Sequence, residues 1–369
     1  MDIVLALSYF LIWIPCMIAW WKVFSWFWVF DKPWKDVAPR EPVPTLQWVT
    51  VIGTFVILLF LTKYLTELTY YGREFLGLFI WGLVIAAVAI VDELWYLVDK
   101  KYSISAAARM LIQVWVAIVA RWFSWIGIDM IILPWFGWLE LSGLTSLLAT
   151  IWRFVLFINA INRFDGISWL ATGMSSIWFL TIFLLLIIIV FPSFEFMGFE
   201  RNEILLRVKV ISLILFVVSL LGTIMEYKPW GLMRDVGTMF FGFSLGYLAL
   251  LWWAKIGTLL VVLALPLFDA IRVIVDRMKR GHTPLKWDFS HLHYRLLALW
   301  RNRGEVRVFI RTWSLFFMMI VLMLWTNSLS KLILLIVMAL IFFWANIYLY
   351  RVKWYSSNFV PNKPSWKTS

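Results

Sequence analysis

The chain has 369 residues, of which 63% are hydrophobic and only 15% are charged. This composition excludes an ordinary soluble domain and indicates a protein that crosses a membrane several times. The net charge of +12 is spread over the segments between apolar runs, which disfavours nucleic-acid binding. The one cysteine, Cys16, excludes an intrachain disulfide and a cysteine-based metal site.

Apolar runs long enough to cross a bilayer predict about eleven membrane helices. They lie at residues 2–30, 46–62, 75–91, 110–133, 144–162, 167–192, 208–225, 236–254, 256–275, 312–327 and 331–350. The first run has no basic segment before it and no clear cleavage site, so we expect it to remain as a helix. The predicted fold class is therefore all-α, a polytopic integral membrane protein. We expect one transmembrane domain over residues 1–355 and a short polar tail over 356–369.

The positions of Lys and Arg predict the orientation of these helices. If the segment after the first run is cytoplasmic, the cytoplasmic side receives the basic cluster of residues 272–311 and the basic tail. Fewer cations then fall on the other side. By the positive-inside rule, we expect the N-terminus outside and the C-terminus inside.

With this orientation, four polar segments fall on the cytoplasmic face. They contain Asp92 and Glu93 after the third run, Asn159, Asn162 and Asp165 after the fifth, Asp235 before the eighth, and His291, His293 and Arg295 after the ninth. Any single carboxylate is explained as a solvated helix end, where charge costs less than at the bilayer centre. Four such segments on one face favour a functional site.

The residue types in these segments suit phosphate chemistry. An acidic pair with a distant aspartate is suited to Mg²⁺, which prefers oxygen ligands and keeps waters until substrate phosphates replace them. Asparagine amides with an aspartate offer donors and acceptors for a nucleobase or sugar. Lys, Arg and His neutralise a diphosphate as charge moves to the leaving group. Together they predict phosphoryl transfer at a membrane.

Six motifs between the apolar runs carry a family resemblance. They are DKPWKDVAPREPVPTLQW (31–48), VDE (91–93) with SISAAARMLIQ (103–113), NAINRFDGISWLATG (159–173), RDVGTMFFGF (234–243), KIGTLLVVLALPLFDA (255–270) and HLHYRLLALW (291–300). In this order they resemble the polyprenyl-phosphate N-acetylhexosamine-1-phosphate transferase family, glycosyltransferase family 4. The HLHYRLL form is more similar to the undecaprenyl-phosphate GlcNAc-1-phosphate transferase-like branch, whose members start lipid-linked glycans, teichoic acids or O-antigens.

The resemblance implies that a polyprenyl (undecaprenyl) phosphate attacks the β-phosphate of a UDP-N-acetylhexosamine. UMP is released, and a polyprenyl-diphosphate sugar remains in the membrane as the first membrane step of cell-envelope glycan synthesis. It also implies a Mg²⁺ cofactor, with Mn²⁺ as an alternative, and a place in the bacterial inner membrane with a cytoplasmic site. A homodimer is compatible with this interpretation.

The resemblance also implies roles for the site residues. Asp92 and Glu93 fill the acidic pair, and Asp235 is the Mg²⁺-binding aspartate, with Asp92 as a second metal ligand. Asn159, Asn162 and Asp165 belong to the nucleotide side. His291, His293 and Arg295 belong to a loop that contacts phosphate or sugar.

Several positions depart from the family pattern. Glu93 replaces a usual Asp, Ser168 stands where a second Asp is common, Arg234 where Gly precedes the aspartate, and Tyr294 where a further His is usual. Asp99, followed by KKYSIS, is an alternative for the acidic-pair position. These departures leave open a non-catalytic relative, and a multi-span transporter is a further alternative.

Tryptophan is unusually frequent, with 27 residues against 18 glycines. Interfacial anchoring explains part of this excess. Yet seven tryptophans stand where the family pattern has Gly, namely Trp34, Trp48, Trp169, Trp252, Trp253, Trp287 and Trp300. We infer that UGA codons meaning Gly in the source organism are written here as Trp.

Overall fold

The structure is a computed structural model. It describes residues 8–9, 11–16, 18–19, 22–23, 30–31, 43–44, 47–66, 72–98, 104–133, 137–190, 199–227, 232–251, 256–283, 290–300, 302–324 and 328–351. The predicted polar tail and the alternative acid Asp99 lie outside these residues.

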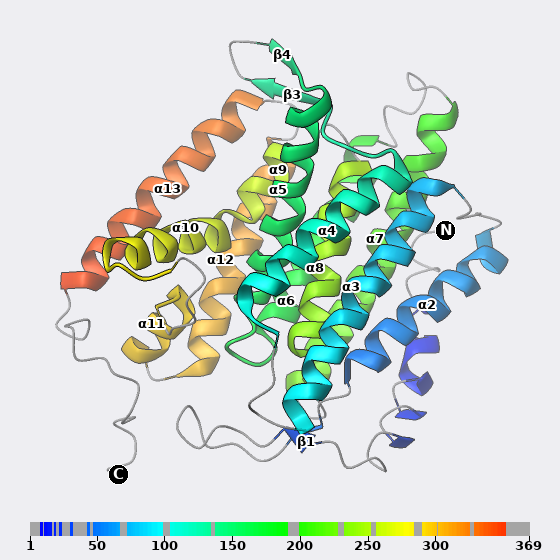
Figure 1. Ribbon diagram of the computed structural model, residues 1–369, viewed down its shortest axis with the longest axis horizontal. Helices are drawn as coiled ribbons and strands as arrows, with labels where there is room; N and C mark the ends of the chain where they lie inside the picture. The colour runs from blue at the N-terminus through cyan, green and yellow to red at the C-terminus, as the bar shows by residue number, and fades with distance from the viewer. Residues whose placement is uncertain are drawn as a thin grey trace.

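The described chain is a bundle of helices with two short β-hairpins (Figure 1). The helices are α2 (Gln47–Thr66), α3 (Arg73–Val98), α4 (Ala106–Ser124), α5 (Gly143–Asn162), α6 (Leu170–Leu185), the π-helix η1 (Leu186–Val190), α7 (Phe199–Tyr227), α8 (Arg234–Leu251), α9 (Ile256–Val262), α10 (Ala264–Lys279), α11 (Leu292–Trp300), α12 (Arg303–Met323) and α13 (Ser328–Arg351). The strands are β1 (Phe30–Asp31) paired with β2 (Val43–Pro44), and β3 (Met130–Leu133) paired with β4 (Gly137–Glu140), both antiparallel.

Helix α8 forms the centre of the bundle. All of its residues from Val236 to Leu251 are buried, and it packs mainly against α5 and α3. Its Gly242 lies so close to α5 that an added Cβ would be 2.5 Å from the Cα of Ile158. Only glycine permits this approach, which brings the ends of α5 and α8 together.

Seven described helices are long and apolar enough to cross a membrane. They cover Arg73–Tyr96, Ala106–Ser124, Gly143–Asn162, Leu170–Ile188, Glu203–Tyr227, Arg303–Met323 and Leu329–Tyr348. The all-helical, polytopic membrane class is thereby confirmed in outline, whereas the count of eleven spans is not. The run 2–30 lies largely outside the described residues, and Trp48–Lys63 is a shorter apolar helix.

Two predicted spans differ from the structure. The run 110–133 was expected to be one helix, but α4 ends at Ser124 and the β3–β4 hairpin follows. Trp125 ends the helix in the left-handed conformation. The strand MIIL is apolar, and a short apolar run cannot be assigned to helix or strand from hydropathy alone. The run 256–275 is broken into α9 and α10 at Leu263. Pro266, three residues later, lacks the N–H that a continuous helix would need.

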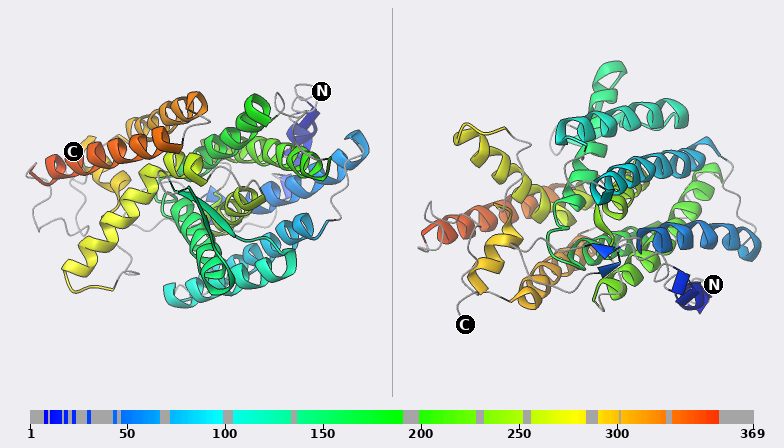
Figure 2. Two further views of the ribbon diagram at one scale, coloured as in Figure 1. Left: turned by 90° about the horizontal axis from the view of Figure 1, so that it is seen from above. Right: turned by 60° about the horizontal axis from the view of Figure 1, so that its bottom comes forward.

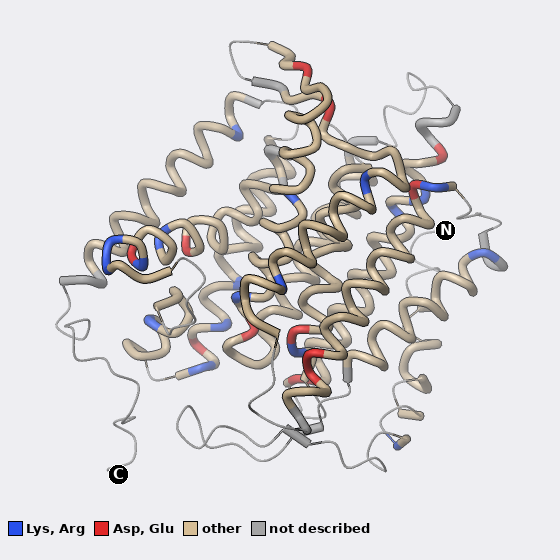
Figure 3. The backbone as a smooth tube through the Cα atoms, in the orientation of Figure 1, with Lys and Arg blue, Asp and Glu red and all other residues tan. Residues whose placement is uncertain are grey.

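The break changes the direction of the chain. Helix α10 runs across the side of the bundle instead of continuing along α9 (Figures 1 and 2). Neither helix is among the seven membrane candidates. Charged residues lie mainly near helix ends, and acidic residues gather where α3 meets α8 (Figure 3).

Candidate active site

One arginine joins the first two predicted acids. Arg109, in the first turn of α4, donates from Nη1 to Asp235 Oδ2 at 2.6 Å, and its Nε lies 3.1 Å from Asp92 Oδ2. The other oxygen of Asp92 accepts the backbone N–H of Ile104 at 2.6 Å. Asp92 is buried, whereas Asp235 is about half-exposed at the start of α8. The structure therefore brings Asp92 and Asp235 to one guanidinium.

The asparagines of α5 lie beside this group, in two different settings. Asn162 donates from Nδ2 to Asp235 Oδ1 and to Thr238 Oγ1, both at 3.0 Å. Asn159, one turn earlier, donates to Gln113 Oε1 at 2.6 Å and to its own helix backbone. Asn162 thus belongs to the Asp235 site, and Asn159 faces α4.

Two departures from the family pattern form an ion pair with each other. The Nε of Arg234 lies 3.1 Å from Glu93 Oε1, so α3 and the start of α8 are joined at this end. Glu93 is buried, and a buried carboxylate needs such a partner because its unpaired charge would cost several kcal/mol. Arg234 also has a positive φ of 48°, a conformation typical of glycine. The longer acid and the arginine therefore compensate for one another.

Asp165 adds a further carboxyl to the site. It follows α5 in the turn at residues 163–166, and its backbone N–H donates to Asn162 at 3.2 Å. Removal from water raises the pKa of Asp165 well above its usual value, and the carboxylates of Glu226, Asp235 and Glu93 raise it further, while Arg234 lowers it. The site thus holds more acidic groups than its local arginines neutralise.

The histidine segment meets this turn at Gly166. A Cβ added to Gly166 would lie 2.2 Å from the Tyr294 hydroxyl and 2.5 Å from Nε2 of His293. His293 is 1% exposed, and neither ring nitrogen has a hydrogen-bond partner among the residues that the structure describes. Burial lowers the pKa of His293 to about 3, with a smaller contribution from His291, so its ring is neutral at pH 7. A neutral imidazole therefore faces the turn that carries Asp165.

Arg295 has a contact with the last helix. It is buried, and its Nη1 donates to Asn346 Oδ1 on α13. This contact ties α11 to the last helix. The prediction that Arg295 contacts phosphate or sugar remains a prediction, and its observed contact is structural.

The segment after Gly166 is held by α12. Arg307 donates to the Ser168 hydroxyl at 2.9 Å, and the guanidinium carbons of Arg307 and Arg311 lie 4.3 and 4.4 Å from the centroid of the Trp169 ring. Glu226 accepts the Trp169 N–H at 2.7 Å and the Thr172 hydroxyl at 2.8 Å. Ser168 and Trp169 also differ from the family pattern, and both are held by side chains of α12 or by Glu226.

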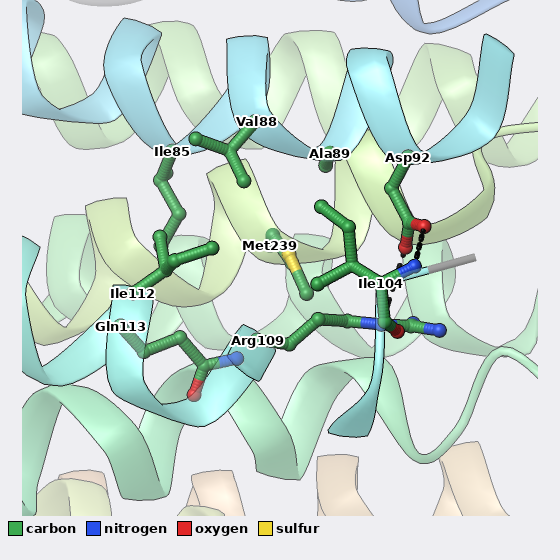
Figure 4. A pocket seen from close by; sticks show the side chains of 9 residues that line it. All are labelled: Ile85, Val88, Ala89, Asp92, Ile104, Arg109, Ile112, Gln113 and Met239. Atoms are coloured by element: carbon green, nitrogen blue, oxygen red, sulfur yellow. Dashed lines mark hydrogen bonds and ion pairs between the residues drawn. The ribbon is translucent and has the colours of Figure 1, made fainter. Parts of the chain in front are cut away.

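A small pocket lies beside Asp92 and Arg109 (Figure 4). Its other lining residues come from α3, α8 and the α4 region and are mostly apolar: Ile85, Val88, Ala89, Ile104, Ile112, Gln113 and Met239. Figure 4 shows the Asp92 carboxylate facing the Ile104 N–H and Arg109 at one end. The pocket joins a charged end to an apolar lining.

The carboxylates of the site suit a divalent cation only together with other ligands. Among the described residues, no three His, Cys, Asp or Glu side chains converge closely enough to hold a metal by themselves. Mg²⁺ commonly uses one or two carboxylates, with waters and substrate phosphates as its other ligands. The half-exposed Asp235 and the raised pKa of Asp165 fit that requirement, because a cation would relieve the excess of acids. Asp92, which is buried, remains only a predicted ligand.

Comparison with known proteins supports the resemblance to one family. The sequence model of glycosyl transferase family 4 matches residues 75–253, which include Asp92, Asn162, Asp165 and Asp235. The part of the chain that holds these residues is therefore similar to glycosyl transferase family 4. The family resemblance of the motifs is thereby confirmed.

Three relatives are similar to the chain over a longer or comparable stretch. It is 31% identical over 212 residues to a Bacillus subtilis protein named probable undecaprenyl-phosphate N-acetylglucosaminyl 1-phosphate transferase, covering 55% of this chain and 54% of that protein. It is 26% identical to a decaprenyl-phosphate N-acetylglucosaminephosphotransferase of Mycolicibacterium smegmatis, over 63% and 59%. It is 25% identical to the Escherichia coli undecaprenyl-phosphate alpha-N-acetylglucosaminyl 1-phosphate transferase, over 54% and 53%. The matches span little more than half of these relatives.

Several residues of the site were not predicted as such. Arg109 lies within the motif of residues 103–113, but the motif alone gave it no role. Glu226 ends an apolar run in the same way as Asp92 and Glu93, so the same signal would have found it. Gln113, Arg307 and Arg311 lie within apolar or mixed helices and carry no local signal of this kind.

Proposed function

We propose that the chain transfers N-acetylhexosamine 1-phosphate, with N-acetylglucosamine as the first candidate sugar, from a UDP-sugar to a polyprenyl phosphate. UMP is the second product. The observation that carries this proposal is the meeting of Asp92 and Asp235 at Arg109, with Asp165 near enough to feel the charge of Asp235, at one end of the bundle. The names of the three relatives, all N-acetylglucosamine 1-phosphate or phospho transferases, support it.

The proposed reaction joins two anionic substrates, and the basic residue of the site lowers their repulsion. In the proposed step, an oxygen of the lipid phosphate bonds to the β-phosphorus, and the bond from that phosphorus to the bridging oxygen breaks. Arg109 neutralises one of the anions as they approach, which lowers their mutual repulsion. The apolar pocket beside Arg109 supports a substrate that joins a charged head to a hydrocarbon chain.

Asn162 and Asp165 are the proposed contacts on the nucleotide side, and the neutral imidazole of His293 borders the same turn. Asp235 and Asp165 are the proposed ligands of Mg²⁺. When bound, Mg²⁺ supplies positive charge that stabilises phosphate oxygens in the transition state. Asn162 holds Asp235 in place through its amide.

The test is UMP release by the purified full chain in detergent with lipid. We expect release only when undecaprenyl phosphate, UDP-N-acetylglucosamine and Mg²⁺ are all present. Replacing the sugar nucleotide by UDP-N-acetylgalactosamine identifies the preferred sugar. Release without a lipid acceptor, or none with any acceptor and donor, would contradict the proposal, and the latter result would favour a transporter.

Asp235→Ala provides the first variant for this assay. We expect a loss of roughly 100-fold or more in turnover with the fold intact, because a phosphate-stabilising group is removed. Glu140→Ala, an exposed carboxylate on β4 at the hairpin, is the matched control and should keep full turnover. An Asp235→Ala protein that still releases UMP at the wild-type rate would contradict the assignment of Asp235 as a metal ligand.

A non-catalytic relative is the second candidate. It is favoured by the pairing of Asp92 and Asp235 with one arginine and of Glu93 with another. In that case the carboxylates would serve only to join α3, α4 and α8. Binding of UDP-N-acetylglucosamine without any UMP release would favour this candidate.

A further inference from the structure

The junction between α10 and α11 contains a buried carboxylate outside the group of acids described above. Asp269 lies on α10, is 2% exposed, and reaches the residues that begin α11. Its Oδ2 is 2.8 Å from Nδ1 of His291, and its Oδ1 accepts the backbone N–H of Leu292 at 2.9 Å. Arg272 adds a third donor to Oδ1 at 3.2 Å.

These contacts keep Asp269 ionised. Burial raises the pKa of its carboxyl, but the hydrogen bond from His291 and the nearby charge of Arg272 outweigh burial and bring it to about 2. An ionised carboxylate accepts hydrogen bonds and donates none. The Nδ1 of His291 must therefore carry the proton, and Nε2 is the ring nitrogen that Asp269 leaves available.

His291 is coupled to the site through His293. The two rings are stacked, with centroids 6.0 Å apart and planes 6° from parallel. The His293 ring lies against the Asp165–Gly166 turn, where Gly166 has no Cβ to obstruct it. The Phe164 ring also packs against the His293 ring, with their centroids 5.6 Å apart. A change in the orientation of the His291 ring would therefore shift His293 and, through it, the turn that carries Asp165.

We propose that Asp269 is a positioning residue for the transfer proposed above: it fixes the ring orientation and tautomer of His291, so that Nε2 is the nitrogen offered to a phosphate of the substrates. Asp269 itself touches no substrate. The inference rests on the proposed function, and it assigns His291 a partner that sets its protonated nitrogen.

Asp276 provides a matched control on the same helix. It also accepts a hydrogen bond from Arg272, at 3.0 Å, but the structure shows its contact with that arginine and none with His291. Asp269→Asn and Asp276→Asn each remove one negative charge from α10 next to the same guanidinium. A general effect of charge or of Arg272 would appear in both variants, whereas an effect through His291 would appear only in Asp269→Asn.

The kinetic test compares these variants in the UMP-release assay. We expect Asp269→Asn to lower kcat by about 10- to 100-fold, the range typical of groups that orient a functional histidine, with KM for the UDP-sugar changed little. Asp276→Asn should stay near the wild-type kcat. Adding Asp269→Asn to a His291→Gln variant should cause no further loss, because the two residues act as one unit. Multiplicative losses, or equal losses in Asp276→Asn, would overturn the proposal.

The spectroscopic test does not need turnover. The chain has only three histidines, so ¹⁵N labelling of the imidazoles gives few signals, and His291→Gln assigns the one of interest. We expect the His291 signals of the wild type to show the proton on Nδ1 and those of Asp269→Asn to show it redistributed to Nε2. An unchanged tautomer would overturn the proposal. If the wild type released no UMP but the tautomer changed as expected, the proposed function would fail while the Asp269–His291 assignment held.

Discussion

Two tryptophans hold backbone conformations that only glycine adopts without strain. Among the described residues, the non-glycine residues with positive φ are Trp125 at 59°, Trp169 at 54° and Arg234 at 48°. This conformation costs other residues about 1–2 kcal/mol. Trp169 is one of the positions at which the sequence suggested a recoded glycine. Trp125 was not, and it supports the same inference independently.

The other suggested positions do not add to this argument. Trp48 lies in α2 and Trp300 in α11, where helical φ favours no glycine. Trp34, Trp252, Trp253 and Trp287 lie outside the described residues. The conformational evidence for recoding therefore rests on Trp125 and Trp169.

Two exposed tryptophans at the C-terminal end of α4, one inside the helix and one directly after it, allow a test of the strain. Trp122 and Trp125 are 78% and 79% exposed, but Trp122 is helical and Trp125 is left-handed. We expect Trp125→Gly to raise the free energy of unfolding by about 1 kcal/mol and Trp122→Gly to lower it by about the same amount. The check is the sign of the shift in Tm in detergent. Equal shifts of the same sign would contradict the strain argument.

The recoding inference has a direct measurement of its own. We expect peptides of the protein from its source cells to have the mass of glycine at positions 125 and 169, because both backbones require positive φ. Reading the codons at these positions completes the test, with UGA as the expected codon. A tryptophan mass at both positions would show that the strain is real and is compensated by contacts such as those of Arg307 and Arg311.

At the scale of elements, α8 connects the site to the bundle. Its first turn supplies Arg234 and Asp235, which contact α3 and α4, and Asn162 at the end of α5 contacts Asp235. The geometry of these contacts depends on how closely α8 approaches α5. Gly242, against the backbone of Ile158, sets that distance.

Replacing Gly242 tests this close approach. We expect Gly242→Ala to lower the free energy of unfolding by about 1–3 kcal/mol and to reduce UMP release, because the helices must separate. Gly82→Ala on α3 is the control, since its Cβ would meet Phe240 at an ordinary 3.4 Å. Thermal unfolding and turnover of both variants provide the check. A Gly242→Ala protein as stable as Gly82→Ala would contradict the packing argument.

At the scale of the whole molecule, charge and apolar surface are separated along the bundle. The acidic residues at the junction of α3 and α8 lie at one end, and the β3–β4 hairpin lies at the other (Figures 1 and 3). The helices between these ends expose many large apolar side chains, as a hydrocarbon environment requires. The positive-inside rule predicts that the acidic end faces the cytoplasm.

Cysteine labelling tests this orientation. After Cys16→Ser removes the one cysteine, Arg280→Cys marks the end of α10 and Trp138→Cys marks the hairpin, both at exposed positions. We expect a membrane-impermeant maleimide to label Trp138→Cys in intact cells and Arg280→Cys only after permeabilisation. The reverse pattern would show that the predicted orientation is wrong.

The sequence by itself determined the membrane class, most helix positions and the resemblance to one family. Apolar runs of sufficient length report burial in lipid, and motifs report residues that are close along the chain. These local signals identified Asp92, Asn162, Asp165 and Asp235 as candidates. They overestimated the helix at 110–133, because hydropathy does not distinguish an apolar strand such as MIIL from a helix.

Only the tertiary structure decided how these residues meet. Arg109 and Asp235 are 126 residues apart in the chain, and Asp269 and His291 are joined across a change of helix direction. No local pattern contains such pairs, because they depend on where α8 packs and where α10 turns. The contacts of Arg109 and Asp269 came to light for this reason, as did the contact of Arg295 with Asn346 on α13.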